Sequence, residues 1–170
     1  ILTNAYRYQT KSYGTSFGAK LAQGEAFEKK VVKYLNKQAN IEAWKSSSVV
    51  HDIQFTVEVP LIGSLAFSAE CKWDDRAFST NNLAIQTWDN GKPSGVHPEG
   101  PNPDLWVHGV ANDVWFIKTS ILRSIITMHR QSWGGKTIKM GDQGAGAQGV
   151  LMPVATAKNI KGGTWVTINA

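Results

Sequence analysis

The chain has 170 residues and a mass of 18.6 kDa, which is one domain's worth and enough to bury a hydrophobic core without disulfide or metal staples. Its 42% hydrophobic and 18% charged residues exclude a disordered tail and a collagen-like fibre. No apolar run is long enough for a transmembrane helix, so we expect no membrane partner. The single cysteine, Cys71, cannot form an internal disulfide, which is typical of a reducing, cytoplasmic location.

The charge is unevenly distributed along the chain. The net charge is +5 and the pI is near 9.4, which mildly favours binding to polyanions. Residues 1–50 carry an excess of Lys and Arg, residues 51–100 an excess of Asp and Glu, and residues 101–170 again an excess of Lys and Arg. A basic protein with an acidic centre suits a metal site that approaches phosphates, although ordinary surface patterning explains the distribution equally well.

The N-terminal part predicts an arm followed by one helix. Residues 1–22 are polar and contain glycine, and we expect an irregular lead-in there. Residues 24–37 then predict an amphipathic helix, because apolar side chains recur at helical spacing. These side chains are Phe27, Val31, Tyr34 and Leu35.

Two alternating segments follow and predict a β-hairpin. Residues 51–59 place apolar side chains at positions 53, 55, 57 and 59, and residues 65–73 also alternate. The intervening residues 60–64 contain Gly63 and have the length of a hairpin loop. The two strands are therefore expected to pair with each other.

The second half of the chain predicts further strands and helices of one α/β domain that spans residues 1–170, since neither a repeat nor a linker is evident. The expected elements, in chain order, are a short helix near 82–88, strands at 105–110 and 113–118, a helix capped by Thr119 or Ser120, a glycine-rich loop at 134–149, and apolar segments at 150–154 and 165–168.

The hairpin is expected to bring three reactive side chains together. With a loop of residues 60–64, Val59 pairs with Leu65, and Asp52 then lies opposite Lys72. Because strand residues alternate between faces, Asp52, Glu70 and Lys72 all project from the polar face, at the open end of the hairpin. A two-residue change in loop length preserves this arrangement, whereas a one-residue slip reverses the face of Asp52.

These residue types fit phosphoryl chemistry with a divalent cation. Two carboxylates on adjacent strands, with the main-chain carbonyl of Cys71, can supply the oxygen ligands that a hard cation takes. The Lys72 ammonium can orient a water, lower its pKa or stabilise charge on a pentavalent phosphorus. The alternative is that Glu70 and Lys72 are ordinary solvent-facing strand residues and that Asp52 caps a turn.

A helix, an Asp on one strand and Glu-x-Lys on the next resemble the PD-(D/E)XK nuclease superfamily, which includes type II restriction enzymes and Holliday junction resolvases. The matching segments are Gly24–Glu28, His51–Asp52 and Ala69–Lys72, so the resemblance covers residues 24 to about 73. His51 replaces the proline that nominally precedes the Asp. Later segments are similar to small phage-encoded members of the superfamily, namely Thr80–Asn82, Gly91–Gly95 and Pro103–Trp106.

The resemblance implies a restriction-endonuclease-like core, a mixed central sheet flanked by helices in the order αβββαβ. It also implies Mg²⁺ or Mn²⁺ and the hydrolysis of DNA phosphodiesters to 3′-hydroxyl and 5′-phosphate ends. Asp52, Glu70 and the Cys71 carbonyl would bind metal, and Lys72 would assist the attacking water. The helix glutamate of resolvase-like members falls on Glu28, which would be a further catalytic residue and metal ligand; pairing with a lysine is the alternative.

A polar residue that many members place near the active site falls on Gln86, in the expected helix at 82–88. A surface amide is an equally good interpretation of this residue. The setting implied by the resemblance is the cytoplasm of a prokaryotic or phage-infected cell.

DNA is the partner that the resemblance implies, and a resolvase would act as a homodimer in order to cut two strands symmetrically. The alternatives are a non-catalytic nucleic-acid-binding module on the same fold and an RNA-directed nuclease.

Trp44, Trp88 and Trp133 lie near loops, where they could stack on unpaired bases, although packing is the favoured role for most tryptophans. None of the four histidines is marked as a general base. Phosphate contacts are expected from Lys29, Lys30, Lys33, Lys118, Arg123 and Arg130.

Overall fold

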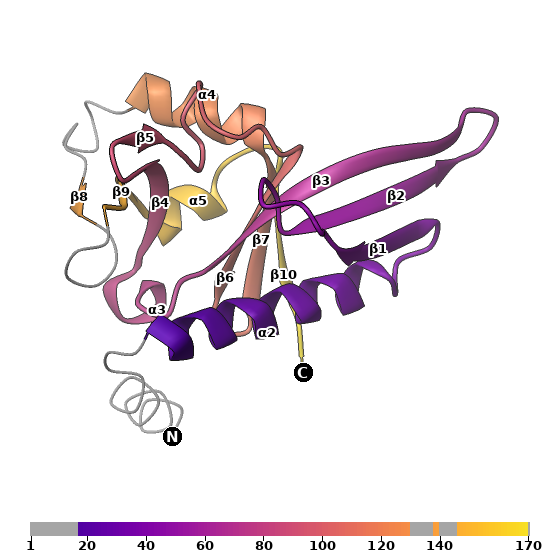
Figure 1. Ribbon diagram of the computed structural model, residues 1–170, viewed down its shortest axis with the longest axis horizontal. Helices are drawn as coiled ribbons and strands as arrows, with labels where there is room; N and C mark the ends of the chain where they lie inside the picture. The colour runs from indigo at the N-terminus through magenta and orange to yellow at the C-terminus, as the bar shows by residue number, and fades with distance from the viewer. Residues whose placement is uncertain (1–16, 130–137, 140–145, 170) are drawn as a thin grey trace.

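The computed structural model describes residues 17–129, 138–139 and 146–169. It contains two β-sheets with helices packed on them (Figure 1). The six-stranded sheet has the order β1-β2-β3-β6-β7-β10 and the four-stranded sheet the order β5-β4-β9-β8. Within the six-stranded sheet β3 and β6 are parallel and the other neighbours antiparallel. The chain is therefore α/β with a mixed central sheet, as predicted. The strands are β1 (Ile41–Lys45), β2 (Ile53–Val59), β3 (Gly63–Trp73), β4 (Asn82–Asp89), β5 (Lys92–Pro93), β6 (Leu105–Val110), β7 (Asp113–Lys118), β8 (Ile138–Lys139), β9 (Gln148–Pro153) and β10 (Gly163–Thr167).

Helix α2 (Phe17–Leu35) covers one face of the six-stranded sheet. Its predicted apolar stripe is confirmed, because Phe27, Val31 and Leu35 are buried against strands β2, β3, β6 and β7. The predicted boundary is wrong at the start: residues 17–22 are helical and not part of an irregular arm. The alanines and leucine of this segment favour helix enough to offset its glycine. Residues 1–16 of the expected arm lie outside the described residues.

The predicted hairpin is present, but its register differs from the expectation. Ile53 pairs with Ala69, and Val59 pairs with Gly63 rather than with Leu65. The connection is shorter because Leu61 and Gly63 adopt positive φ angles of 67° and 98°, which tighten the turn. The shift is two residues, so the side chains of β2 and β3 keep their predicted faces. Asp52, which was expected on the polar face of the strand, precedes β2 and directs its carboxylate to the main chain of Cys71. The expected position of Asp52 opposite Lys72 is therefore wrong.

Residues 82–88 form strand β4, so the predicted helix there is wrong. Leu83, Ile85 and Thr87 are buried in strict alternation, which is the period of a strand. A single helical turn, α3 (Ala77–Thr80), precedes β4. Among the residues that the structure describes, the first six elements run in the expected order αβββαβ, yet β4 joins the second sheet, and β6 takes the place beside β3.

The remaining predictions for the C-terminal half are largely confirmed. Strands β6 and β7 have the expected bounds, helix α4 (Thr119–His129) begins at one of the two residues expected to cap it, and β9 and β10 overlap the two apolar segments. In the expected glycine-rich loop, residues 138–139 form β8 and residues 148–149 begin β9. Residues 134–137 and 140–145 of that loop lie outside the described residues.

A second core lies between the two sheets and α4. It joins Leu83 and Met152 of the four-stranded sheet to Trp106 and Trp115 of the six-stranded sheet and to Leu122 of α4. Helix α5 (Val154–Lys158) closes one side of it through Ala157. None of the described helices is both long enough and apolar enough to span a bilayer.

Candidate active site

The predicted site lies where strand β2 begins beside the C-terminal half of β3. β3 continues to Trp73, whereas the pairing of β2 with it ends at Ile53 and Ala69. On its other side, β3 stays paired with β6 through Trp73. The last residues of β3 therefore have a free edge on the β2 side, where no strand residue pairs with their main chain.

Asp52 occupies that free edge with its carboxylate. Its main-chain N–H donates to the carbonyl of Ala69 at 3.1 Å, and its Oδ2 accepts the N–H of Cys71 at 2.7 Å. The Asp52 carbonyl in turn accepts the N–H of Ser46. Both the main chain and the side chain of Asp52 are thus anchored, and one carboxylate oxygen replaces the carbonyl that a longer β2 would present to Cys71.

Glu70 and Lys72 form an ion pair on the same face of β3, with 2.9 Å between Glu70 Oε1 and Lys72 Nζ. Burial raises the pKa of Glu70, and Lys72 only partly offsets this effect. Burial disfavours the charge on Lys72, but the carboxylates of Glu70 and Asp52 outweigh it and raise the Lys72 pKa. Lys72 is therefore an ammonium at neutral pH. We call Asp52, Glu70 and Lys72 the carboxylate–lysine cluster.

Glu28 lies on α2, which covers the opposite face of the sheet from Glu70 and Lys72. Its Oε2 lies 3.1 Å from Nζ of Lys45 on β1, and its side chain is only 14% exposed. The hydrogen bond with Glu28 raises the pKa of Lys45. Glu28 thus makes the contact that the alternative interpretation predicted, since its carboxylate pairs with a lysine. Glu28 is nevertheless close enough to contribute to the raised pKa of Glu70.

Cys71 contributes to the site through its main chain and not through its thiol. The thiol is buried in the core beneath α2, and burial raises its pKa well above the usual value, so it is not a nucleophile. The N–H and C=O of a strand residue point to the same edge. Because the Cys71 N–H points to Asp52, its carbonyl points to the same free edge of β3.

The oxygen atoms at this edge are suitable ligands for a hard divalent cation. Asp52 and Glu70 supply carboxylates and Cys71 supplies a carbonyl, and Mg²⁺ commonly binds one or two carboxylates while it keeps several waters. In the described part of the chain, no three His, Cys, Asp or Glu side chains are gathered into a group that would bind a metal unaided. The donor set thus fits a cation that shares its coordination with water and a phosphate, not an all-protein cage.

Gln86 has its contacts elsewhere. It lies on β4 of the four-stranded sheet, and its side-chain amide donates to Ser94 Oγ at 3.3 Å and to the carbonyl of Trp88 at 3.5 Å. The hydrogen bonds of the described residues do not connect it to the carboxylate–lysine cluster. Because the helix that was expected to carry it is a strand of the other sheet, the structure lends its predicted catalytic role no support.

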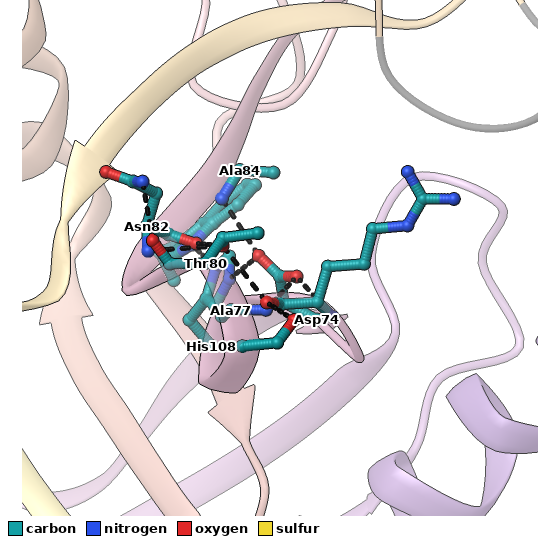
Figure 2. Close-up of polar contacts among 9 residues, drawn as sticks. Asp74, Ala77, Thr80, Asn82, Ala84 and His108 are labelled. Atoms are coloured by element: carbon teal, nitrogen blue, oxygen red, sulfur yellow. Dashed lines mark hydrogen bonds and ion pairs between the residues drawn. The ribbon is translucent and has the colours of Figure 1, made fainter. Parts of the chain in front are cut away.

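Behind Lys72 lies a buried polar network that the sequence analysis missed (Figure 2). His108 of β6 is the register partner of Lys72 and is fully buried. Its Nε2 lies 3.2 Å from Asp74 Oδ2, and its Nδ1 accepts the indole N–H of Trp106 at 3.2 Å. An indole N–H only donates, so His108 Nδ1 is unprotonated and Nε2 carries the proton toward Asp74.

Asp74 is the centre of this network. Its Oδ1 accepts the main-chain N–H groups of Arg76 and Ala77, and its Oδ2 accepts the N–H of Ala84 (Figure 2). Burial opposes its ionisation, but the hydrogen bonds from His108 and the main chain prevail and lower its pKa. Asp74 thereby fixes the path of the chain from β3 to β4. An Asp directly after a strand and before a helical turn was the one available sign of this role.

The cations predicted to contact phosphate differ in whether their charged groups are available. Lys29, Lys30, Lys33 and Lys118 are exposed. Arg123 of α4 is not available, because its guanidinium donates to the carbonyls of Val96, His97 and Pro101 and to Asn102 Oδ1. Arg130 lies outside the described residues.

Comparison of the chain with protein families, with curated proteins and with solved structures finds no significant match.

Proposed function

We propose that this protein is a metal-dependent DNA endonuclease with a restriction-endonuclease-like core. The observation that carries the proposal is the Asp52 carboxylate, held by the Cys71 N–H beside the Glu70–Lys72 ion pair at the free end of β3. Asp52 directly precedes β2, and Glu70 and Lys72 lie on the neighbouring strand β3; this supports the arrangement that the resemblance to the PD-(D/E)XK superfamily implies.

In this proposal, Asp52, Glu70 and the Cys71 carbonyl hold Mg²⁺ or Mn²⁺, and Glu28 adds negative charge from the α2 side. When bound, the ion activates water and neutralises phosphate charge. The raised pKa of Glu70 reflects the cost of burying its charge, and a divalent cation offsets that cost.

Lys72 acts in the proposal as a fixed cation. Its ammonium stabilises the negative charge that develops on the phosphoryl oxygens. The oxygen of the attacking water bonds to phosphorus and releases a proton to solvent. The bond from phosphorus to the 3′ oxygen breaks, and that oxygen keeps the electron pair and takes up a proton from solvent. The products carry a 5′-phosphate and a 3′-hydroxyl.

The exposed lysines supply sequence-independent contacts to the DNA backbone. Lys29, Lys30 and Lys33 lie together on α2 and are exposed, so they are available to neutralise phosphates. Each neutralised phosphate releases counterions, and the affinity for DNA is expected to fall steeply as salt is added. A shallow dependence on salt would contradict a backbone-dominated interface.

Cleavage assays with the full chain test the proposal directly. Supercoiled plasmid, a four-way junction, single-stranded DNA and RNA are incubated with and without Mg²⁺. We expect Mg²⁺-dependent cleavage of DNA, reduced at least 100-fold in Asp52→Asn, Glu70→Gln and Lys72→Met. Glu58→Gln is the matched control, because Glu58 is an exposed carboxylate toward the other end of β2.

Each outcome of these assays is informative. Cleavage that is equal in the three variants and in the wild type contradicts the site. DNA binding without Mg²⁺ and without cleavage favours the alternative of a non-catalytic nucleic-acid-binding module. Cleavage of RNA alone assigns the site to an RNA-directed nuclease.

A dimeric junction resolvase is the second candidate, and the tip of the β2–β3 hairpin favours it. Leu61 and Ile62 at the tip are 108% and 70% exposed, and the hairpin projects from the rest of the molecule (Figure 1). Residues 46–71 contain neither Lys nor Arg, so this arm suits contact with a second copy of the chain better than contact with phosphate. The combined variant Leu61→Ser/Ile62→Ser is expected to convert a dimer to a monomer in light-scattering measurements. A wild-type monomer on junction DNA excludes this candidate.

The cytoplasm of a prokaryotic or phage-infected cell is the setting that we propose for this activity. It is consistent with the free, buried thiol of Cys71.

A further inference from the structure

A hollow of about 300 Å³ lies over the part of the six-stranded sheet that β1, β2 and β3 form. Its lining comes from β1, β2 and β3 and from the residue before β6. The residues are Trp44, Gln54, Phe55, Ala66, Phe67, Ser68 and Asp104. The hollow belongs neither to the metal ligands nor to the hairpin tip discussed above.

Strand register places the hollow close to the cluster. Trp44 pairs with Gln54 and Gln54 pairs with Ser68, so the three side chains lie side by side on one face. Ser68 is two residues before Glu70 and shares its face. With about 4.8 Å between strands and about 7 Å per two residues, the Cα of Trp44 lies about 12 Å from that of Glu70. This is within reach of a nucleotide one or two positions from a phosphate at the cluster.

The ring of Trp44 is available for stacking. Trp44 is 41% exposed, whereas Trp106 and Trp115 are fully buried in the core. Its indole N–H donates to Gln54 Oε1 at 3.2 Å, which holds the ring in place. A large aromatic face that is fixed and partly exposed is a suitable platform for a base, because every base has a π-face.

Polar groups beside the ring complement the edge of a base. Asp104 Oδ2 accepts the N–H of Ser68 at 2.8 Å and its hydroxyl at 3.2 Å, which leaves Oδ1 as an acceptor for an amino group. The Gln54 amide, whose oxygen is engaged by Trp44, retains its NH₂ donors. The hollow therefore combines a π-face with a donor and an acceptor.

The hollow itself has no positively charged side chain in its lining, which disfavours contact with the phosphate backbone there. Residues 46–71 contain no Lys or Arg, and Asp104 adds a negative charge at the hollow. This surface would repel phosphates, yet it can bind an uncharged base. Bases within a duplex are stacked on their neighbours and do not present their faces, so the occupant must be unpaired.

We propose that Trp44, Gln54 and Asp104 form a base-stacking site for an unpaired base, one or two nucleotides from the phosphodiester at the carboxylate–lysine cluster. This inference rests on the proposed nuclease function and specifies its substrate class: nucleic acid that contains an unpaired nucleotide next to the cleaved bond, such as a single strand, a flap or a gap.

Binding measured without catalysis tests the site separately from the nuclease. The full chain is titrated in EDTA with a fluorescein-labelled single-stranded DNA oligonucleotide and with the duplex of the same sequence, at one fixed salt concentration. Trp44→Ala is expected to weaken single-strand binding by about 5- to 150-fold, since base–aromatic stacking contributes about 1–3 kcal/mol. Its affinity for the duplex is expected to stay unchanged. Trp44→Phe keeps a π-face and is expected to restore most of the affinity.

Phe78→Ala is the matched control, because Phe78 is an exposed aromatic residue outside the hollow. Equal single-strand affinity in Trp44→Ala and wild type overturns the inference. An equal loss for single strand and duplex, or a change in oligomeric state in Trp44→Ala, also overturns it. If Trp44-dependent binding is found but Mg²⁺ elicits no cleavage, the base site stands and the nuclease proposal fails. If Mg²⁺ elicits cleavage but binding does not depend on Trp44, the nuclease proposal stands and the base site fails.

Discussion

Replacing Asp74 by Asn tests the buried network behind Lys72. The Asp74 carboxylate accepts four hydrogen bonds, two at each oxygen. Asn keeps one oxygen, which still serves Arg76 and Ala77. Its NH₂ group then faces the Ala84 N–H and the His108 Nε2–H, so two hydrogen bonds become contacts between donors. His108 cannot accommodate the change by moving its proton, because Trp106 requires Nδ1 as an acceptor.

The expected cost is large for a single substitution. A hydrogen bond to a charged group contributes about 1.5–3 kcal/mol, and two such bonds are lost, so we expect Asp74→Asn to lower the free energy of unfolding by about 3–6 kcal/mol. Urea denaturation followed by tryptophan fluorescence measures this difference. Asp89→Asn, an exposed carboxylate on β4, is the control and is expected to change stability by less than about 0.5 kcal/mol. A loss below about 1 kcal/mol in Asp74→Asn would refute the role assigned to the network.

The difference in stability between wild type and Asp74→Asn is expected to depend on pH. The pKa of Asp74 is lowered in the folded protein, so its ionisation stabilises the fold fully above the pKa of an unfolded Asp, about 3.9. That contribution is lost as the pH falls through the folded pKa. The stability difference between wild type and Asp74→Asn should therefore be constant near neutral pH and shrink below about pH 4. A difference that grows in acid would contradict the assignment.

Two further substitutions test how the fold supports the site. A Cβ at Gly109 would lie 2.5 Å from Phe27 Cε2 and 2.8 Å from Trp73 Cε3. Gly109→Ala is therefore expected to lower the free energy of unfolding, measured in urea, by about 1–3 kcal/mol. An unchanged midpoint of urea denaturation would show that α2 does not pack this closely. Arg123→Met removes the hydrogen bonds that hold residues 96–102 to α4, and we expect faster proteolysis in this segment; cleavage at the wild-type rate would contradict the clamp.

The faces of the hairpin were predictable, whereas its register was not. Alternation of apolar residues in two neighbouring segments determines which side chains share a face, and this brought Asp52, Glu70 and Lys72 together. The register depends on the number of residues in the turn. That number depends in turn on the positive φ of Leu61, a conformation that no local pattern indicates for a branched apolar residue.

Features that depend on distant partners were missed. The segment 82–88 is a strand because β9 pairs with it, with Leu83 opposite Met152, and only that partner makes its alternation meaningful. His108 and Asp74 are 34 residues apart in sequence, so neither residue alone suggested a buried pair. Arg123 was expected on DNA, but its partners are carbonyls of a loop that the sequence did not place beside α4.

The central claim is that Asp52 and Glu70 hold a divalent cation together. Titration of the full chain with Mn²⁺, followed by electron paramagnetic resonance of the free ion, measures this directly. We expect binding that is lost in Asp52→Asn and in Glu70→Gln. Lys72→Met should bind at least as tightly as wild type, because the ammonium that pairs with Glu70 at 2.9 Å is removed. Mn²⁺ binding that is the same in wild type, Asp52→Asn and Glu70→Gln would contradict the account.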